Sequence, residues 1–188
     1  MKEYGELLRD DPQYAVRARE FAARCRDVSE LLAELEPRAP RQEIRLRVAY
    51  HDACHLQHAQ GIRSAPRRLL HSIPGVEVRE IAESEICCGS AGTYNLLQPD
   101  LAAALRDRKL ANIALTRADL VAAGNIGCIT QLAGGSPLPV VHTVELLDWA
   151  TGGPTPRALP SAGVSESPPA AGNVGGSAPG SAATAAAR

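Results

Sequence analysis

The sequence predicts an α/β fold: a parallel sheet of about four strands with flanking helices, preceded by an N-terminal helix and followed by a disordered C-terminal tail. Three observations indicate this class. Strand-like and helix-like segments alternate along residues 44–150, as is typical of a parallel sheet covered by helices. Aromatic residues make up only 3% of the chain, so the core must be built mainly from Leu, Val, Ile and Ala. Residues 151–188 change to a composition of Ala, Gly, Pro and Ser.

The N-terminal segment, residues 1–43, is expected to hold one helix and a linker. The helix is predicted over residues 12–36, because Pro12 suits a first turn that follows a capping aspartate. Its apolar side chains recur at helical spacing: Phe21, Val28, Leu31, Leu32 and Leu35. Pro37 then ends the helix and begins the linker.

Residues 44–150 are expected to form the sheet domain. The predicted strands cover residues 45–50, 76–81, 119–122 and 140–141. The predicted helices cover residues 65–72, 96–115 and 144–150. In the long helix, Arg106, Arg108 and Lys109 indicate a solvated face rather than a clamp for a substrate.

Composition excludes several classes of function. Residues 151–188 have too few large apolar side chains to offset the entropy of ordering, which predicts disorder without chemistry. The formal net charge of -1 provides no basic surface for nucleic acid. No stretch approaches twenty apolar residues, and the polar N-terminus does not look like a signal peptide. The sequence therefore predicts a cytoplasmic protein without direct membrane insertion.

Four cysteines in three short segments are the feature most informative about function. Cys54 lies in the run of residues 51–56, Cys87 and Cys88 are adjacent, and Cys128 lies farther along the chain. Each segment follows a predicted strand, and the carboxyl ends of parallel strands meet at one edge of a sheet. Four thiols that converge there equal the ligand count of an iron–sulfur cluster, which predicts electron transfer.

Two other interpretations of the site stay open. Zinc accepts mixed ligands, so a site of Cys54, Cys87 or Cys88, Cys128 and one histidine competes with a cluster. The candidate histidines, as ligands or as neighbours of ligands, are His51, His55 and His58. Adjacent cysteines reach different irons of one cluster more readily than they reach one zinc ion, which favours the cluster. The adjacent pair could also act as a redox thiol pair without metal, whereas Cys25 is interpreted as a small apolar residue of the N-terminal helix.

Residues 48–149 resemble the cysteine-rich "CCG" domain. That domain occurs in heterodisulfide reductase and in iron–sulfur subunits of glycolate, lactate and glycerol-3-phosphate dehydrogenases. The segments that carry the resemblance are residues 51–58, 86–99, 125–128 and 141–148. Residues 2–8 add a likeness to the iron–sulfur subunits of glycolate oxidase in particular.

The resemblance implies an iron–sulfur electron-transfer subunit of a glycolate oxidase-like complex. A flavin-containing dehydrogenase subunit would oxidise glycolate to glyoxylate, and iron–sulfur centres would pass the electrons toward a quinone-type acceptor. The ligands of a 4Fe-4S type cluster carry over to Cys54, Cys87, Cys88 and Cys128. Any attachment to the inner membrane would be peripheral, through partner subunits.

The chain departs from the family pattern in three places. Gln131 stands where a Cys-x-x-Cys would place a fifth thiol, which argues against a heterodisulfide reductase-type cluster and leaves a four-thiolate site. Ala53 replaces the usual proline. The ferredoxin-like region and the first CCG repeat of the longer subunits are not in the chain. We therefore expect another chain or domain to supply them; the alternatives are a zinc-stabilised scaffold without redox activity and an inactive, truncated gene fragment.

Overall fold

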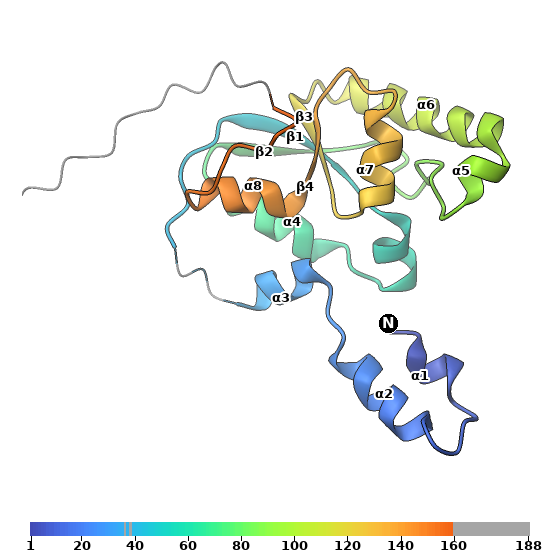
Figure 1. The fold of residues 1–188 in the computed structure, drawn as a ribbon. Helices are drawn as coiled ribbons and strands as arrows, with labels where there is room; N and C mark the ends of the chain where they lie inside the picture. The colour runs from blue at the N-terminus through green and yellow to red at the C-terminus, as the bar shows by residue number, and fades with distance from the viewer. Residues whose placement is uncertain (36, 38, 160–188) are drawn as a thin grey trace, which may run out of the picture.

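A four-stranded parallel sheet forms the centre of the molecule, as the sequence predicts (Figure 1). The computed structural model describes residues 1–159 apart from residues 36 and 38. Neighbouring strands in space follow the order β2-β1-β3-β4. The strands are β1 at Leu46–His51, β2 at Val76–Glu80, β3 at Leu120–Ala123 and β4 at Val140–His142. In the register of the sheet, Val48 lies between Val78 on β2 and Leu120 on β3.

Helices cover both faces of this sheet. The first face packs against α4 at Ser64–His71 and α8 at Thr143–Ala150, and the second against α6 at Pro99–Leu115 and α7 at Ile126–Ala133. The chain turns toward one edge of the sheet after β1 and toward the other edge after β3. The carboxyl ends of β1 and β3 therefore flank the point of reversal, where ligand sites of open parallel sheets lie.

Side-chain alternation along β1 divides the core into two layers. Val48 and Tyr50 belong to the layer that contains α4 and α8, whereas Ala49 belongs to the layer that contains α6 and α7. Because the side chains of a strand alternate between faces, His51 shares the face of Ala49. The last residue of β1 thus points a polar ring, which is 1% exposed, toward the α6–α7 side of the molecule.

The single N-terminal helix predicted over residues 12–36 is wrong. The structure has α1 at Tyr4–Leu7, α2 at Ala15–Arg24 and α3 at Val28–Glu34. Cys25 is extended (φ -68°, ψ 127°) and ends α2. Asp27 then starts α3: its carboxylate accepts from Ser29 N at 2.9 Å, and Glu30 accepts from Asp27 N at 2.9 Å. Such a reciprocal cap strongly favours the start of a new helix. The chain therefore forms two helices here, although the apolar spacing alone indicates one.

The other predicted elements fall into two groups. The four strands and the helices over 65–72 and 144–150 agree with the structure to within one residue at each end. The predicted helix over 96–115 is instead two helices, α5 at Tyr94–Leu97 and α6, because Pro99 disfavours a helical conformation at Gln98 (φ -135°). Helix α7 and the short π-helical turn η1 at His55–Ala59 were not predicted at all.

The chain beyond α8 continues along the body of the protein for several residues. Pro156 is buried, and Leu159 packs against the core layer of α4 and α8. The remainder of the predicted disordered tail, residues 160–188, lies outside the described residues. Within the described part of the chain, no helix has the length and apolar character needed to cross a membrane.

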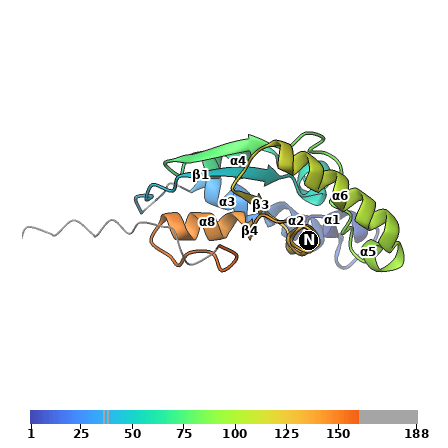
Figure 2. The same ribbon diagram turned by 90° about the horizontal axis from the view of Figure 1, so that it is seen from above.

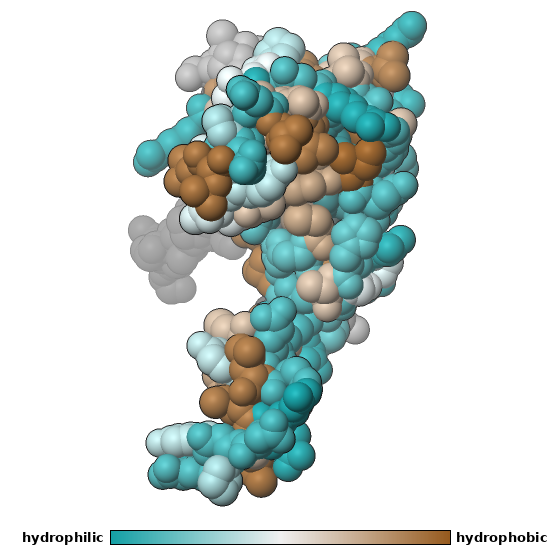
Figure 3. Space-filling view, turned by 90° about the vertical axis from the view of Figure 1, so that its right-hand side faces the viewer, coloured by the Kyte–Doolittle hydropathy of each residue, from teal (hydrophilic) through white to brown (hydrophobic). Residues whose placement is uncertain are grey.

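Large apolar side chains stay exposed at one end of the molecule. They comprise Leu96, Leu97 and Leu101 at the corner between α5 and α6, and Leu7, Val16 and Phe21 on α1 and α2. Figure 2 shows α6 reaching beyond the sheet with α5 at its far end, and Figure 3 views this end and shows apolar surface above and below. Exposed apolar surface of this kind is typical of contact with another protein.

The reciprocal cap of α3 yields a first prediction. Asp27→Ala should lower the free energy of unfolding by about 1 kcal/mol, because two backbone N–H groups lose their acceptors or their geometry. Urea unfolding followed by circular dichroism measures the change. Asp10→Ala is the control, because the Asp10 side chain is 91% exposed and caps no helix. Equal stabilities of the two variants would contradict this account of the helix start.

Candidate metal centre

The three cysteine segments lie together at the carboxyl edge of the sheet. Cys54 follows β1 and caps η1, Cys87 and Cys88 lie in the loop after β2, and Cys128 follows β3. Cys128 belongs to the first turn of α7 rather than to a loop, and its backbone N–H donates to Asn125 Oδ1 at 3.1 Å. Strand order alone brings these segments side by side, because β1 is flanked by β2 and β3.

The four thiols influence one another in series. Cys87 contributes to the raised pKa of Cys54, Cys88 to that of Cys87, and Cys128 to that of Cys88. The Sγ atoms of Cys88 and Cys128 lie within 4.8 Å of each other. The backbone N–H of Gly89 also donates to Cys87 Sγ at 3.3 Å. All four side chains are free thiols, and Cys88 and Cys128 are buried.

These surroundings favour the protonated form of the Cys54, Cys87 and Cys88 thiols. The hydrogen bond to Cys128 is the main cause that raises the pKa of Cys88 to about 11. The hydrogen bond to Cys88 raises the pKa of Cys87, and burial raises the pKa of Cys54, with a further contribution from Cys87. A metal would have to displace these protons, so binding should release protons and strengthen as the pH rises.

His51 completes the donor set from the end of β1. One of its ring nitrogens and the Sγ atoms of Cys88 and Cys128 all lie within 4.8 Å of one another. The ring is 1% exposed, and neither nitrogen has a hydrogen-bond partner among the described residues. Burial lowers the pKa of His51 to about 4, with a smaller contribution from Lys109, so the ring is neutral and can donate a lone pair. An orphaned buried imidazole beside thiols fits a metal centre on chemical grounds.

The structure does not bring the other two candidate histidines into this set. His55 and His58 are both exposed on η1. His58 Nε2 lies 3.2 Å from the carbonyl oxygen of Glu85, which links η1 to the loop that carries Cys87. The side chain of His58 therefore supports the loop that carries Cys87.

Gly89 allows the backbone of the cysteine loop to lie close to the backbone of helix α6. Its φ of +91° lies in the region that side chains rarely adopt, and a Cβ atom at this position would lie 2.3 Å from the Ala102 carbonyl oxygen. A similar close approach joins the loop to α7, where a Cβ on Gly127 would lie 2.9 Å from Ser90 Oγ. Two glycines thus allow the backbones of three segments to converge on the thiols.

Comparisons with known proteins find a matching family and several relatives. Residues 48–133 match the protein family described as "Cysteine-rich domain" (CCG). The chain is 39% identical over 152 residues to the glycolate oxidase iron-sulfur subunit of Escherichia coli (strain K12). It is 34% identical over 163 residues to the probable glycolate oxidase iron-sulfur subunit of Bacillus subtilis (strain 168).

The alignments cover most of this chain but a smaller share of the relatives. They span 80% and 81% of the chain, and 37% and 36% of the E. coli and B. subtilis proteins respectively. Lactate utilization protein A of Oceanobacillus iheyensis is 28% identical over 154 residues, which are 79% of this chain and 63% of that protein. The resemblance stated from the sequence motifs is confirmed, and the chain corresponds to somewhat more than a third of the glycolate oxidase subunits it matches.

The prediction that Lys109 lies on a solvated face of the long helix is wrong. Its side chain is 1% exposed, and its ammonium donates to the carbonyl oxygens of Glu83 (2.5 Å) and Ser84 (3.4 Å). The missed signal is spacing: Lys109 falls on the inward stripe of α6 between Leu105 and Ile113. The prediction holds for Arg108, whose exposed guanidinium pairs with Glu83.

A buried ion pair anchors the segment that carries Cys54. Arg67 of α4 donates to both carboxylate oxygens of Asp52, at 2.9 and 2.7 Å, and also pairs with Glu80 at the end of β2. The Asp52 side chain is only 2% exposed, and the guanidinium lies 4.9 Å from the ring centroid of Tyr50. The hydrogen bonds to Glu80 and Asp52 raise the pKa of Arg67, so its charge is permanent. The pair fixes β1, β2 and α4 together next to the thiols.

Gln131, which stands at the position of the missing fifth thiol, serves a structural contact. Its Nε2 donates to the Ala102 carbonyl oxygen at 3.4 Å, and its Oε1 accepts from Asn95 at 3.3 Å. The carboxamide therefore ties α7 to α5 and α6 instead of adding a metal donor.

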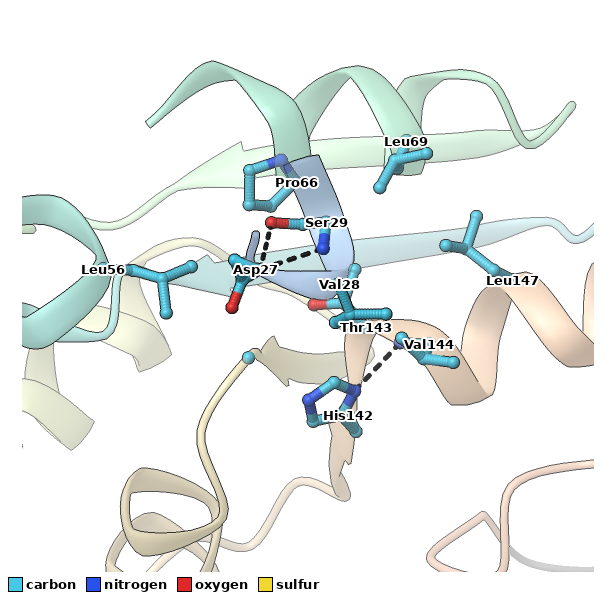
Figure 4. Close-up of a pocket in the computed structure, with 11 residues that line it drawn as sticks. Asp27, Val28, Ser29, Leu56, Pro66, Leu69, His142, Thr143, Val144 and Leu147 are labelled. Atoms are coloured by element: carbon cyan, nitrogen blue, oxygen red, sulfur yellow. Dashed lines mark hydrogen bonds between the residues drawn. The ribbon is translucent and has the colours of Figure 1, made fainter. Parts of the chain in front are cut away.

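The pocket on the other side of the sheet is separate from the thiols. It lies among α3, α4 and the start of α8, and Figure 4 shows the apolar side chains of Leu56, Leu69 and Leu147 around it. His142 lies at its edge, where Nδ1 accepts from Val144 N at 3.1 Å and caps α8. The described residues that line the pocket include no cysteine, so its role is the packing of α3 on the domain.

The close approach at Gly89 yields a prediction about stability. Gly89→Ala should lower the free energy of unfolding by at least about 2 kcal/mol, because the added Cβ collides with backbone on α6 and the φ is unfavourable. Gly92→Ala is the matched control: its φ is +65°, but no atom lies within 4 Å of the added Cβ, so only about 1 kcal/mol is expected. Urea unfolding of both variants measures the difference, and equal losses would show that the approach to Ala102 does not matter.

The buried ion pair yields a second prediction for this region. Arg67→Met should cost about 3 kcal/mol of folding free energy, because it leaves the Asp52 carboxylate buried without a partner. Arg79→Met removes an exposed pair with Glu77 of the same strand, β2, and should change stability by less than about 0.5 kcal/mol. Thermal and urea unfolding compare the variants. A loss as small for Arg67→Met as for Arg79→Met would mean that the pair does not anchor this edge.

Proposed function

We propose that the cysteine-rich domain binds an iron–sulfur cluster of the 4Fe-4S type through Cys54, Cys87, Cys88 and Cys128. The observation that carries this proposal is the convergence of the three cysteine segments at the carboxyl edge of the sheet, where Cys88 and Cys128 lie within 4.8 Å of each other. Four thiolates are the usual ligand count of such a cluster. The adjacent pair of cysteines supports a group larger than one ion, since two neighbouring thiols reach separate metal atoms more readily than the same one.

The bound cluster would supply one-electron transfer, and the protein would control it through its surroundings. The Gly89 N–H already donates to Cys87 Sγ, and such hydrogen bonds to ligand sulfurs raise a reduction potential. In this assignment His51 is a neighbour of the ligands that can also replace one of them. His58 supports the adjoining loop that carries Cys87.

We further propose that the chain is the electron-transfer part of a glycolate oxidase-like complex. A flavin-containing dehydrogenase subunit would oxidise a 2-hydroxy acid such as glycolate, and electrons would pass through this domain toward a quinone-type acceptor. The names of the relatives support this: glycolate oxidase iron-sulfur subunits and lactate utilization protein A. Ferredoxin-like clusters and the first CCG repeat would come from a further chain or domain, and the predicted cytoplasmic location suits such a partner.

A zinc-stabilised scaffold is the second candidate, and one observation favours it. A ring nitrogen of His51 and the thiols of Cys88 and Cys128 lie within 4.8 Å of one another, within reach of a single ion after small side-chain movements. Cys54 or Cys87 would supply the fourth ligand. The domain would then hold partner subunits together without carrying electrons.

Metal and sulfide analysis separates the two candidates. We expect protein purified without air to contain about four iron and four acid-labile sulfide per chain, with cluster absorption and an EPR signal after reduction. About one zinc per chain without sulfide would overturn the cluster assignment in favour of the scaffold. Neither metal, together with reversible oxidation of Cys87 and Cys88, would overturn both.

Ligand substitutions sharpen this test. Cys87→Ser and Cys88→Ser should each lower bound iron by about tenfold or more if both thiols hold one cluster. A zinc site built on His51, Cys88 and Cys128 should lose its metal in Cys88→Ser but tolerate Cys87→Ser, provided that Cys54 is its fourth ligand. Cys25→Ser is the control, because Cys25 lies at the end of α2 and its thiol donates to the Phe21 carbonyl oxygen.

A further inference from the structure

Lys109 is a buried cation without a carboxylate partner. The side chain is 1% exposed, and its two hydrogen bonds go to the neutral carbonyl oxygens of Glu83 and Ser84. Among the ion pairs of the described residues, none includes Lys109. Lysines are rarely fully buried unless they are paired, because removing an ammonium group from water is costly.

Two of the groups that interact with this charge belong to the thiol site. The positive charge of Lys109 contributes to the lowered pKa of His51, and the Cys88 thiol opposes the lowering of the pKa of Lys109 that burial causes. Asp52, Glu83 and Glu85 also act on Lys109, but each has its own partner or is exposed. Asp52 is held by Arg67 through two hydrogen bonds, Glu83 by Arg108, and Glu85 lies at the surface.

The Lys109 side chain also holds the turn that precedes Cys87 and Cys88. Glu83 adopts a φ of 54°, an unusual conformation for a residue with a side chain. Three residues of α6 hold this turn. Lys109 donates to the Glu83 carbonyl oxygen, and Arg108 donates to the Glu83 carboxylate. Asn112 Nδ2 donates to the neighbouring Ala82 carbonyl oxygen at 3.1 Å. A lysine is not needed for a contact with carbonyl oxygens alone, since a neutral donor would serve at a lower desolvation cost.

We propose that Lys109 supplies the buried positive charge that compensates the metal-bound thiolates of Cys54, Cys87, Cys88 and Cys128. This inference rests on the proposed metal centre. A thiolate-bound cluster carries net negative charge that grows on reduction, so a nearby ammonium group stabilises the reduced form more than the oxidised form. Lys109 therefore raises the reduction potential of the cluster, in addition to holding the Glu83 turn.

Three substitutions separate the charge from the contact. Lys109→Gln keeps a donor for the Glu83 carbonyl oxygen but removes the charge, Lys109→Met removes both, and Lys109→Arg restores a cation. The matched control is Arg108→Gln, which removes an exposed, ion-paired charge from the next position of the same helix. Each variant is purified without air and assayed for iron, zinc, sulfide and thermal unfolding, and is then titrated with dithionite in the presence of redox mediators.

We expect Lys109→Gln to retain its cluster. At a fixed solution potential, the ratio of reduced to oxidised cluster should fall by about tenfold. This change corresponds to a reduction potential about 59 mV lower for one electron. Lys109→Arg should recover most of this shift, and Arg108→Gln should stay within about twofold of the original protein. Lys109→Met should show the shift together with a lower cluster content. An unchanged potential in Lys109→Gln, with its cluster intact, would overturn the inference while leaving the proposed function standing.

The experiment also decides the case in which the proposed function fails. If the unsubstituted protein holds zinc without sulfide, zinc affinity is measured by chelator competition, and the charge predicts about tenfold weaker binding in Lys109→Gln but not in Arg108→Gln. Equal affinities would overturn the inference for zinc as well. An unsubstituted protein that binds neither metal overturns both proposals.

Discussion

The carboxyl edge of the sheet buries polar groups beside an apolar core layer, and one of them, His51, has no hydrogen-bond partner among the described residues. His51, Cys88 and Lys109 lie at the end of a layer that is otherwise built from residues such as Val121 and Ile113. Each unpaired buried polar group costs about 1–3 kcal/mol, a large share of the net stability of about 5–15 kcal/mol that is typical of a domain. Metal binding would turn the same nitrogen and thiols into ligands, so stability and metal binding are coupled at this edge.

Topology explains why the thiols gather where they do. Cys54 and Cys128 follow β1 and β3, which are neighbours in the middle of the sheet, and the reversal of strand order leaves open space between their carboxyl ends. The Cys87–Cys88 loop follows β2, the other neighbour of β1, and the glycine at position 89 lets it approach α6 closely enough to reach the same place. The fourth strand contributes no thiol; its last residue, His142, caps α8 instead.

Local patterns in the sequence were sufficient for the sheet, the flanking helices and the convergence of the cysteines, because strand alternation and strand order determine them. The missed features depend on contacts between distant residues or on single backbone positions. The break before α3 comes from the cap at Asp27, and the break before α6 from Pro99, a signal that the apolar spacing concealed. The pairing of Arg67 with Asp52 joins helix α4 to the end of strand β1. The sequence of neither segment alone indicates this contact. Lys109 also had a readable signal, namely its place on an apolar stripe of α6.

Each of the three cysteine segments is held by its own contact from a different element. Arg67 of α4 holds the segment after β1, Lys109 of α6 holds the turn before the adjacent cysteines, and the side chain of Asn125 caps the turn that contains Cys128. The first cation is matched by carboxylates, whereas the second donates to carbonyl oxygens. Since protein contacts hold all three segments, the fold places the donors near one another. A donor set positioned in this way can keep the same geometry in two oxidation states, as electron transfer requires.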